Sequence, residues 1–357
     1  MMHTNTTRKI SSRFAGLVLV AAFVAMVAPA ITIAAQPAGY RILVTNERGG
    51  TLSVIDGVSR KVVSTVPLGK RPRGMKLSPD GKLLYVALSG SPIAGPGVDA
   101  KSLPPADKGA DGIGIVDMGT LKLVNILRGV SDPEQLAVSA DGKRLYIASE
   151  DTGRGIILDA VTGKTIASLP VGEEPEGVTL SPDGKFVYMS SEEDHQITVI
   201  DTSTNKAVAT FEVGLRPRFT EFSDDGAQAF VSGENDGTIT VVNARTHKVQ
   251  RTIKLPGEMT RPVGMAISHD GKKLYTVTGR GKNLLSVDIA SGKVLATVEV
   301  GPRPWGVALS PDGATLFTAN GNSNDVSVVD AATMKVVARI PVGDSPWGLI
   351  VQKTSGK

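Results

Sequence analysis

The sequence predicts an all-β protein: a seven-bladed β-propeller of four-stranded antiparallel blades, whose ring is closed by pairing the C-terminal strand with the N-terminal blade. Two observations lead to this prediction. A proline-led phrase recurs along the 357-residue chain at intervals of 61, 42, 42, 45, 42 and 42 residues. The first and last repeats are also incomplete in complementary ways. A fixed period near 42 residues is typical of repeat architectures, and four short strands per period are typical of propeller blades.

The repeat that begins at Pro175 shows how each element is expected to form. Residues 177–181 alternate apolar and polar side chains, as a half-buried strand does. The Pro-Asp-Gly-Lys sequence at 182–185 is a hairpin turn into a second strand, because Asp-Gly tolerates the positive φ that such turns need. Residues 196–200 and 207–211 supply the third and fourth strands.

The ring closure follows from the two ends of the repeat pattern. The last copy of the phrase, residues 346–351, stops where its Asp-Gly turn should come. Residues 40–46 read as a second strand with no first strand before it. We therefore expect the C-terminal segment to supply the innermost strand of the first blade, which leaves no open sheet edge in the ring.

Residues 1–35 read as a signal peptide rather than as part of the fold. Three basic residues among the first 13 precede an apolar run, residues 14–34, that ends in small side chains. The alternative is an uncleaved membrane anchor, since the run is long enough to span a bilayer. In both cases residues 36–357 form an exported propeller domain, periplasmic or secreted, with no membrane span in the mature chain.

Composition excludes several classes of function. Three of the 39 basic residues and none of the 35 acidic ones lie in the leader, so the remaining chain is nearly neutral. A general electrostatic field for nucleic acid is therefore not expected. Cysteine is absent, which excludes disulfides, thiol chemistry and c-type haem attachment. We expect a monomer.

One end of the ring is expected to carry the working surface. The hairpin turns at the other end are nearly the same in every repeat, whereas the loops between second and third strands differ, and binding residues usually lie on such loops. The 61-residue interval adds a long insertion, residues 90–108, to this variable end. An insertion of this kind acts as a lid or partner contact, or is a neutral addition tolerated at a loop tip.

The candidate site residues are expected at the mouth of the central channel. Each directly follows either a second strand or the recurring proline that links one blade to the next, here called the interblade proline. They are Glu134, Glu150, Glu176, Glu192, Arg73, Arg218, Trp305 and Trp347. The four carboxylates could bind a divalent cation such as calcium. The arginines could bind a carboxylated ligand, and the tryptophans offer flat apolar surface. The alternative is that the charges neutralise each other across neighbouring blades while the tryptophans fill the channel.

Several motifs resemble the YVTN-type seven-bladed propeller repeat over essentially the whole chain after the leader. They are residues 43–46, 181–185, 199–201 and 340–343. Residues 174–177, 216–219 and 318–327 look more narrowly like exported propellers associated with PQQ-dependent alcohol catabolism. The first resemblance implies the fold, and the second implies a periplasmic setting rather than an activity.

Three functions are compatible with these features. The first is a non-enzymatic binding or interaction module that uses the end with the inserted loop, with a periplasmic oxidoreductase or a small carboxylated ligand as partner. The second is a redox protein linked to a quinone, PQQ or haem, with Arg73 and Arg218 on the cofactor's carboxylates and Trp305 or Trp347 on its ring. The third is a metal-dependent propeller lactonase or lyase.

Overall fold

The computed structural model describes residues 1–3, 39–93, 102–257 and 260–354. Residues 4–35 of the expected signal peptide and the tip of the insertion, 94–101, lie outside the described residues. The chain divides into two compact units, residues 1–37 and 38–357, and the description below concerns the second. Among the described residues, no helix is both long and apolar enough to cross a bilayer.

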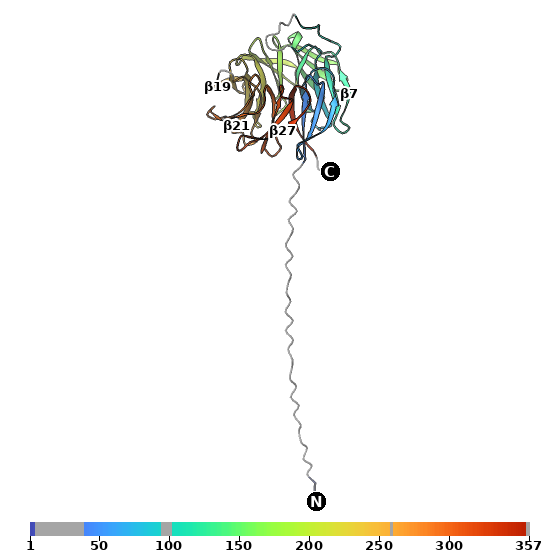
Figure 1. The fold of residues 1–357 in the computed structure, drawn as a ribbon, viewed down its shortest axis with the longest axis vertical. Coiled ribbons are helices and arrows are strands. Elements are labelled where there is room, and N and C mark those ends of the chain that lie inside the picture. Colours follow the sequence, from blue (N-terminus) through green and yellow to red (C-terminus); the bar gives the residue numbers. More distant parts are fainter. Residues whose placement is uncertain (4–38, 94–101, 258–259, 355–357) are drawn as a thin grey trace. The chain divides into compact units, whose positions relative to one another are not determined.

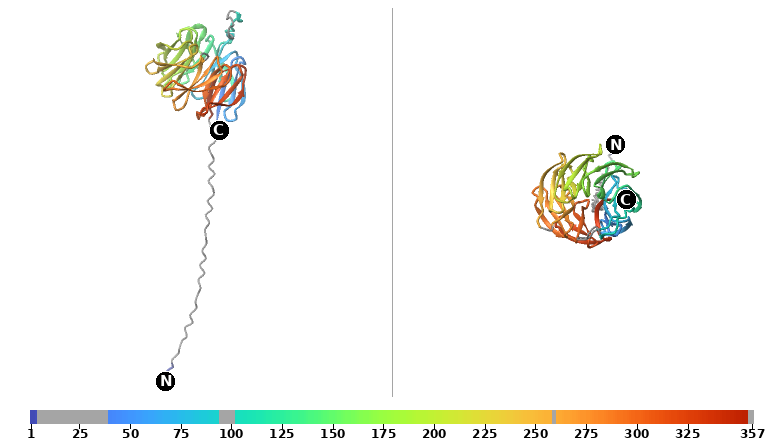
Figure 2. Two further views of the ribbon diagram at one scale, coloured as in Figure 1. Left: turned by 60° about the vertical axis from the view of Figure 1, so that its left-hand side comes forward. Right: turned by 90° about the horizontal axis from the view of Figure 1, so that it is seen from above.

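Seven four-stranded antiparallel sheets surround a common centre, as predicted, and Figure 2 shows the ring from above. The blades, innermost strand first, are β28 (Pro346–Lys353), β1 (Tyr40–Asn46), β2 (Thr51–Asp56), β3 (Lys61–Pro67); β4 (Pro72–Leu77), β5 (Leu83–Leu88), β6 (Gly112–Asp117), β7 (Lys122–Leu127); β8 (Pro133–Val138), β9 (Arg144–Ser149), β10 (Arg154–Asp159), β11 (Thr165–Pro170); β12 (Pro175–Leu180), β13 (Phe186–Ser191), β14 (Gln196–Asp201), β15 (Lys206–Glu212). The other three are β16 (Pro217–Phe222), β17 (Gln228–Gly233), β18 (Thr238–Asn243), β19 (Lys248–Lys254); β20 (Pro262–Ile267), β21 (Lys273–Thr278), β22 (Asn283–Asp288), β23 (Val294–Glu299); β24 (Pro304–Leu309), β25 (Thr315–Asn320), β26 (Asp325–Asp330), β27 (Lys335–Pro341). A short 3₁₀ turn, η2 (Glu150–Thr152), follows β9.

The first blade is completed by the C-terminal strand, which confirms the predicted ring closure. Strand β28 pairs antiparallel with β1, with Leu43 opposite Ile350. The side chain of Thr45 reinforces the seam, because its hydroxyl accepts a hydrogen bond of 2.9 Å from the Gly348 amide. Figure 1 shows strands near the C-terminal end, in red, beside strands near the N-terminal end of the propeller, in blue. The closed ring leaves none of the inner strands unpaired on the blade side.

The repeated hairpin turns owe their shape to short side chains. In the blade of β12, the Ser181 hydroxyl donates to the Asp183 carboxylate at 2.7 Å and accepts from the Phe186 amide at 3.0 Å. Gly184 follows with a φ of 71°, a conformation that costs glycine little. The same Ser–Asp hydrogen bond recurs in the other complete blades, at Ser78, Ser139, Ser223, Ser268 and Ser310.

An aromatic ring from six of the seven second strands, all except β1, fills the space between neighbouring blades. These buried residues are Tyr85, Tyr146, Tyr188, Phe230, Tyr275 and Phe317. Tyr188 shows the packing, since its ring contacts Phe222 of the next inner strand edge-on at 4.9 Å. Apolar burial between blades is thus distributed evenly around the ring, and it stabilises the fold without any disulfide.

Glycine at the third residue of several inner strands allows these strands to approach one another around the channel. A Cβ atom on Gly264 would lie 2.3 Å from the carbonyl oxygen of Trp305 in the next blade. A Cβ on Gly177 would lie 2.6 Å from the carbonyl oxygen of Arg218. These close approaches keep the channel narrow.

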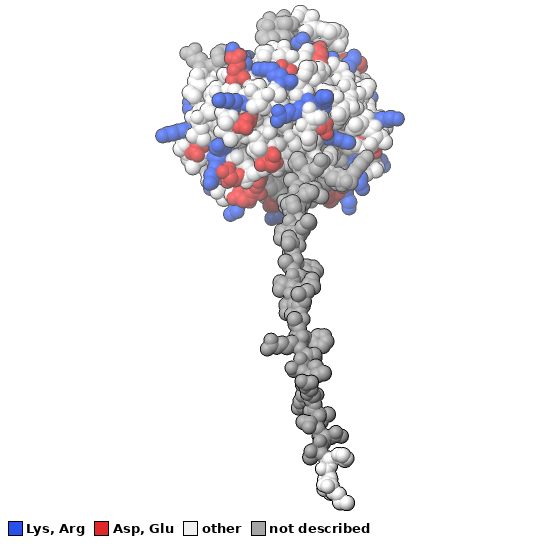
Figure 3. Space-filling view, turned by 60° about the horizontal axis from the view of Figure 1, so that its bottom comes forward, with Lys and Arg blue, Asp and Glu red and all other residues white. Residues whose placement is uncertain are grey.

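Basic and acidic side chains are interspersed on the face of the molecule that Figure 3 turns toward the viewer. Neither sign covers this face alone, which agrees with the nearly balanced charge of the chain after the leader. The unusual concentration of charge lies instead at the channel mouth.

Candidate functional site

The strand register places the candidate residues and the base of the insertion at one end of the ring. Pro72 at the start of β4 pairs with Leu88 at the end of β5, directly before the insertion. Pro304, which precedes the first tryptophan, pairs with the end of β25 in the same way. The insertion is closed at its base by a backbone hydrogen bond of 2.9 Å from the Asp107 amide to the Gly90 carbonyl.

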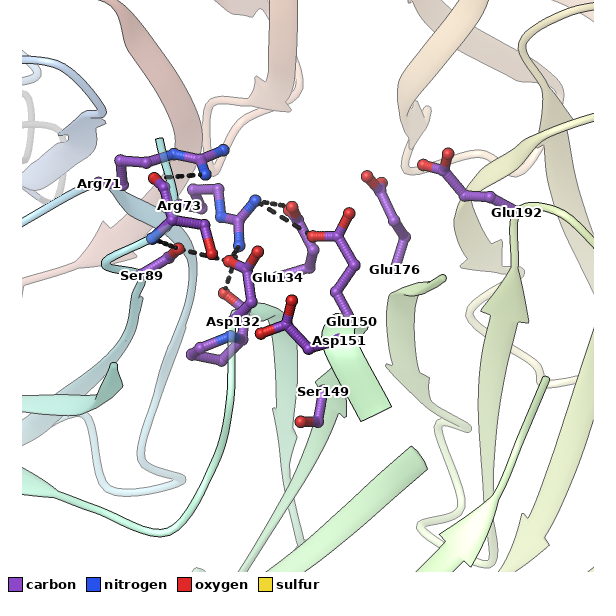
Figure 4. Close-up of polar contacts among 12 residues, drawn as sticks. Arg71, Arg73, Ser89, Asp132, Glu134, Ser149, Glu150, Asp151, Glu176 and Glu192 are labelled. Atoms are coloured by element: carbon purple, nitrogen blue, oxygen red, sulfur yellow. Dashed lines mark hydrogen bonds and ion pairs between the residues drawn. The ribbon is translucent and has the colours of Figure 1, made fainter. Parts of the chain in front are cut away.

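Arg73 is the centre of the first charge cluster at the mouth, shown in Figure 4. Its guanidinium lies 2.6 Å from the Asp132 carboxylate, contacts Glu134, and lies 3.6 Å from Glu150. The arginine is only 2% exposed. We call Arg73, Asp132, Glu134 and Glu150 the Arg73 cluster; it ties the blade of β4 to the blade of β8.

Arg218 is the centre of a second cluster on the other side of the acidic sector. Its guanidinium contacts Glu176 and Glu192, and its Nε lies 2.6 Å from Glu234. Arg216 adds a contact of 2.5 Å to Glu192. We call Arg218, Glu176, Glu192 and Glu234 the Arg218 cluster; it links the blades of β12 and β16.

The pKa values of the carboxyl groups in the two clusters are shifted in different directions, even within the Arg73 cluster. Burial would raise the pKa of Asp132, but Arg73 and the Ser89 hydroxyl hold it below its usual value. Burial raises the pKa of Glu150, with Arg73 opposing the shift. Burial also raises the pKa of Glu192 to about 8, because Arg216 only partly offsets burial and nearby carboxylates. Protons as well as arginines therefore balance the acidic sector near neutral pH.

The four glutamates suggested as ligands for a divalent cation all engage arginine. Glu134 and Glu150 belong to the Arg73 cluster, and Glu176 and Glu192 to the Arg218 cluster. Within the described parts of the chain, no group of three or more His, Asp or Glu residues is placed to hold a metal ion. As arranged here, these carboxylates brace neighbouring blades.

The two tryptophans lie in the sector of the mouth that β24 and β28 form. Their rings stack with centroids 5.9 Å apart and planes 22° apart. Both are half-buried, so part of each indole surface stays accessible. The guanidinium of Arg303 lies 5.2 Å from the Trp305 ring centre, and that of Arg218 lies 5.5 Å from it.

Arg303 differs from the arginines of the two clusters. It is half-buried, yet its guanidinium has no hydrogen bond or ion pair with any residue that the structure describes. Burial lowers the pKa of Arg303, which is the expected effect on a cation without a close anionic partner. Arg303 directly precedes Pro304 and has a left-handed backbone conformation, with a φ of 55°. In this conformation its side chain reaches the mouth.

A cavity of about 90 Å³ extends below the tryptophans into the channel. Its upper wall includes Trp305, Trp347, Arg218 and Glu176. The rest of its lining is mainly apolar, apart from Lys76 and Gln135. An opening of this kind, with an aromatic wall and few polar groups, is typical of small-ligand sites.

The structure brings together all eight residues selected from the sequence, but it also shows partners that the sequence reasoning missed. Asp132, Arg216 and Arg303 each precede an interblade proline and have φ values of 43°, 56° and 55°. The signal was present in the sequence as a charged residue directly before each of these prolines. Selecting only the residues after each proline and after each second strand missed these three side chains.

Two family models match parts of the sequence. The choice-of-anchor I domain matches residues 20–216, more than half of the chain. The lactonase, 7-bladed beta-propeller, matches residues 200–337. No curated protein matches the chain.

Solved structures with the same fold come from proteins with different activities. Hydrazine synthase of Kuenenia stuttgartiensis is 21% identical, with a TM-score of 0.68, covering 81% of this chain and 92% of that one. A candidate 6-phosphogluconolactonase from Bacteroides fragilis is 18% identical, with a TM-score of 0.72, covering 89% and 99%. Dihydro-haem d1 dehydrogenase NirN, in complex with DHE, is 18% identical, with a TM-score of 0.63, covering 87% and 74%. At these identities the comparison establishes the propeller fold, and the YVTN and PQQ resemblances stay predictions.

Proposed function

The chain belongs to the choice-of-anchor I domain family, and for this member we propose an exported, non-enzymatic binding module that holds a planar acidic ligand at the channel mouth. The ligand would lie against Trp305 and Trp347, with one of its carboxylates on Arg303. The export part of the proposal rests on the leader, whose basic start and apolar run are typical of a signal peptide.

The half-buried, unpaired guanidinium of Arg303 is the observation that carries the proposal. A buried cation is normally paired, because desolvation without a partner is costly. Arg73 and Arg218 already have three carboxylate partners each within this chain. A ligand carboxylate would therefore meet direct competition at these two arginines, whereas among the described residues no carboxylate forms an ion pair with Arg303. The planar fork of arginine also suits a carboxylate in two-point contact.

The tryptophans favour a flat, conjugated ligand over an aliphatic acid. Part of each indole surface is exposed at the mouth, and aromatic faces bind planar rings by offset stacking. The cavity of about 90 Å³ is smaller than the roughly 150 Å³ that holds benzene. A tricyclic quinone or a haem-like ring would therefore rest on the mouth instead of entering the channel.

Fluorescence titration with pyrroloquinoline quinone tests this proposal, because the chain contains only two tryptophans and both lie at the mouth. Saturable quenching is expected for the wild type, with binding weakened about tenfold or more in Arg303→Ala, the loss of one charge-assisted contact. Arg245→Ala is the matched control, since Arg245 is exposed on a hairpin turn at the other end of the ring. Equal binding by Arg303→Ala and the wild type would show that the site is assigned wrongly.

Export is tested separately by cell fractionation. The full chain should be found outside the cytoplasm, and a chain starting at residue 36 should be retained inside. Retention of both forms in the cytoplasm would contradict the role proposed for residues 1–35.

A lactone hydrolase is the second candidate, favoured by the match of residues 200–337 to the lactonase propeller model. Hydrolysis of a sugar lactone, measured by the proton that the acid product releases, would support it. If turnover is present, Glu192→Gln and Glu234→Gln should be compared, because both carboxylates lie at the mouth, Glu234 within the matched segment and Glu192 just before it. Absence of turnover with intact ligand binding would favour the binding module.

A further inference from the structure

Two opposite charges lie at the same level inside the central channel. Lys76 and Glu221 are each the fifth residue of an inner strand, β4 and β16. The blades of β8 and β12 separate these strands on one side of the ring, and three blades separate them on the other. The remaining residues at this level are uncharged: Ala137, Thr179, Ala266, Ala308 and Ile350.

Neither charged side chain is paired within the protein. Both Lys76 and Glu221 are half-buried, and across the described ranges neither has a hydrogen bond or an ion pair. Lys76 is nevertheless close enough for its charge to lower the pKa of Glu221 against the effect of burial. The space between them therefore separates two groups that attract each other, in a part of the molecule where polar groups normally have partners.

The cavity above this level has the size and lining for a very small ligand. Its volume is about 90 Å³, against roughly 150 Å³ for a cavity that holds benzene. Besides the residues at the mouth, its lining includes the apolar Met265, Leu349, Ile350 and Phe219, the amide residue Gln135, and Lys76. Lys76 is thus the cation in a mainly apolar part of the lining.

We propose that this lower part of the channel is a subsite for a short monocarboxylate such as formate or acetate. The carboxylate accepts a hydrogen bond from the Lys76 ammonium, and the methyl group of acetate contacts the apolar wall. Glu221 lies at the level of Lys76 but outside the lining of the cavity, and in its protonated form it adds no negative charge that would repel the carboxylate. This subsite does not depend on the planar ligand proposed for the mouth, because it uses neither Arg303 nor the stacked indoles.

The protonation of Glu221 supports this arrangement. Burial raises the pKa of Glu221 to about 7, with Lys76 lowering it and Asp224 raising it. The inner strands on either side of β16 present Thr179 and Ala266 at this level, which do not titrate. Arg218 and Glu176 line the upper cavity and pair with each other. A carboxyl group at this level of the channel does not repel a nearby anion while it is protonated, but it repels the anion once it is ionised.

Calorimetric titration of the purified chain with sodium acetate and sodium formate tests the subsite, with sodium chloride at equal ionic strength as control. Saturable binding is expected for the two carboxylates and not for chloride. Lys76→Met should weaken acetate binding about tenfold or more, since it removes a charge-assisted contact while keeping an unbranched side chain. This variant should fold, because Lys76 has no hydrogen bond or ion pair to lose among the described residues.

The pH dependence provides the second arm. Between about pH 6 and pH 8, wild-type acetate affinity should fall about tenfold, because the protonated fraction of a group with a pKa of about 7 falls by that factor. Glu221→Gln should bind acetate with no such dependence. Arg303→Ala should bind acetate as the wild type does, which separates this subsite from the mouth.

Three outcomes would overturn the subsite. They are acetate and formate binding no better than chloride, Lys76→Met binding acetate as tightly as the wild type, or saturable binding of methylammonium in place of acetate. The last result would reassign Glu221 as the recognition group for a cation. If the wild-type protein bound acetate but not pyrroloquinoline quinone, only the function proposed for the mouth would be contradicted.

Discussion

Replacing Arg73 with methionine should destabilise the propeller by about 3–5 kcal/mol, the usual effect of breaking a buried ion pair from one side. The size follows from the surroundings of the guanidinium. Arg73 is 2% exposed and has carboxylates of Asp132, Glu134 and Glu150 around it. Methionine fills much of the volume but leaves these acids without their cation. Against a total stability of about 5–15 kcal/mol, this loss is large.

The pH dependence of this penalty gives the sharper test. In the wild type the pKa of Asp132 is lowered, so its contribution to stability is present above its unfolded pKa and is lost as the pH falls through its folded pKa. In Arg73→Met the same carboxyl should have a raised pKa and favour the protonated form. The penalty should therefore be larger at about pH 8 than at about pH 5.

Urea unfolding followed by far-UV circular dichroism measures both quantities. The control is Arg339→Met, which removes an arginine that is 44% exposed and 3.4 Å from Asp325. That loss should be about 1 kcal/mol or less, as for other exposed pairs. A loss of similar size in the two variants, or a penalty for Arg73→Met that does not change with pH, would refute the reasoning.

Three further predictions concern closure, the channel and the acidic sector. A chain ending at Ser345, which lacks β28, should give no cooperative unfolding by circular dichroism, whereas one ending at Thr354 should unfold as the full chain does. Gly264→Ala should cost about 1–3 kcal/mol in urea unfolding, more than Gly119→Ala, whose Cβ meets its nearest atom at 3.4 Å. The pKa of Glu192 is about 8 in the folded protein and lower in the unfolded chain, so the free energy of unfolding should fall as the pH rises from the unfolded pKa to about 8. Thermal unfolding of Glu192→Gln should not show this dependence on pH.

The fold could be predicted from the sequence because each blade carries its own local signals. Ser181 and Asp183 form their turn from side chains two residues apart, and the same bonds recur in the other complete blades. Ring closure followed from a missing strand at one end and a surplus strand at the other, and β28 pairs with β1 as expected. Such features need only sequence spacing and strand pairing, not the positions of distant side chains.

The pairing of charges at the mouth could not be predicted in the same way. The sequence placed Arg73 and Glu134 at equivalent positions in adjacent blades, but not the direction of each side chain. Arg73 reaches Asp132, which precedes a proline in the left-handed region, an unusual conformation for a residue before proline. The unpaired state of Arg303 depends on every neighbour, so only coordinates could show it.

The charge clusters and the stacked tryptophans join neighbouring blades at the mouth in two different ways. Inner strands of neighbouring blades do not hydrogen-bond to each other as strands, since each belongs to its own four-stranded sheet. At the mouth, Arg73 and Arg218 reach the neighbouring blades through carboxylates, as the brace between β4 and β8 shows. The sector of Trp305 and Trp347 is joined instead by indole stacking. Since Arg303 has no ion pair among the described residues, the proposed ligand would find a cation and a flat aromatic surface in this one sector.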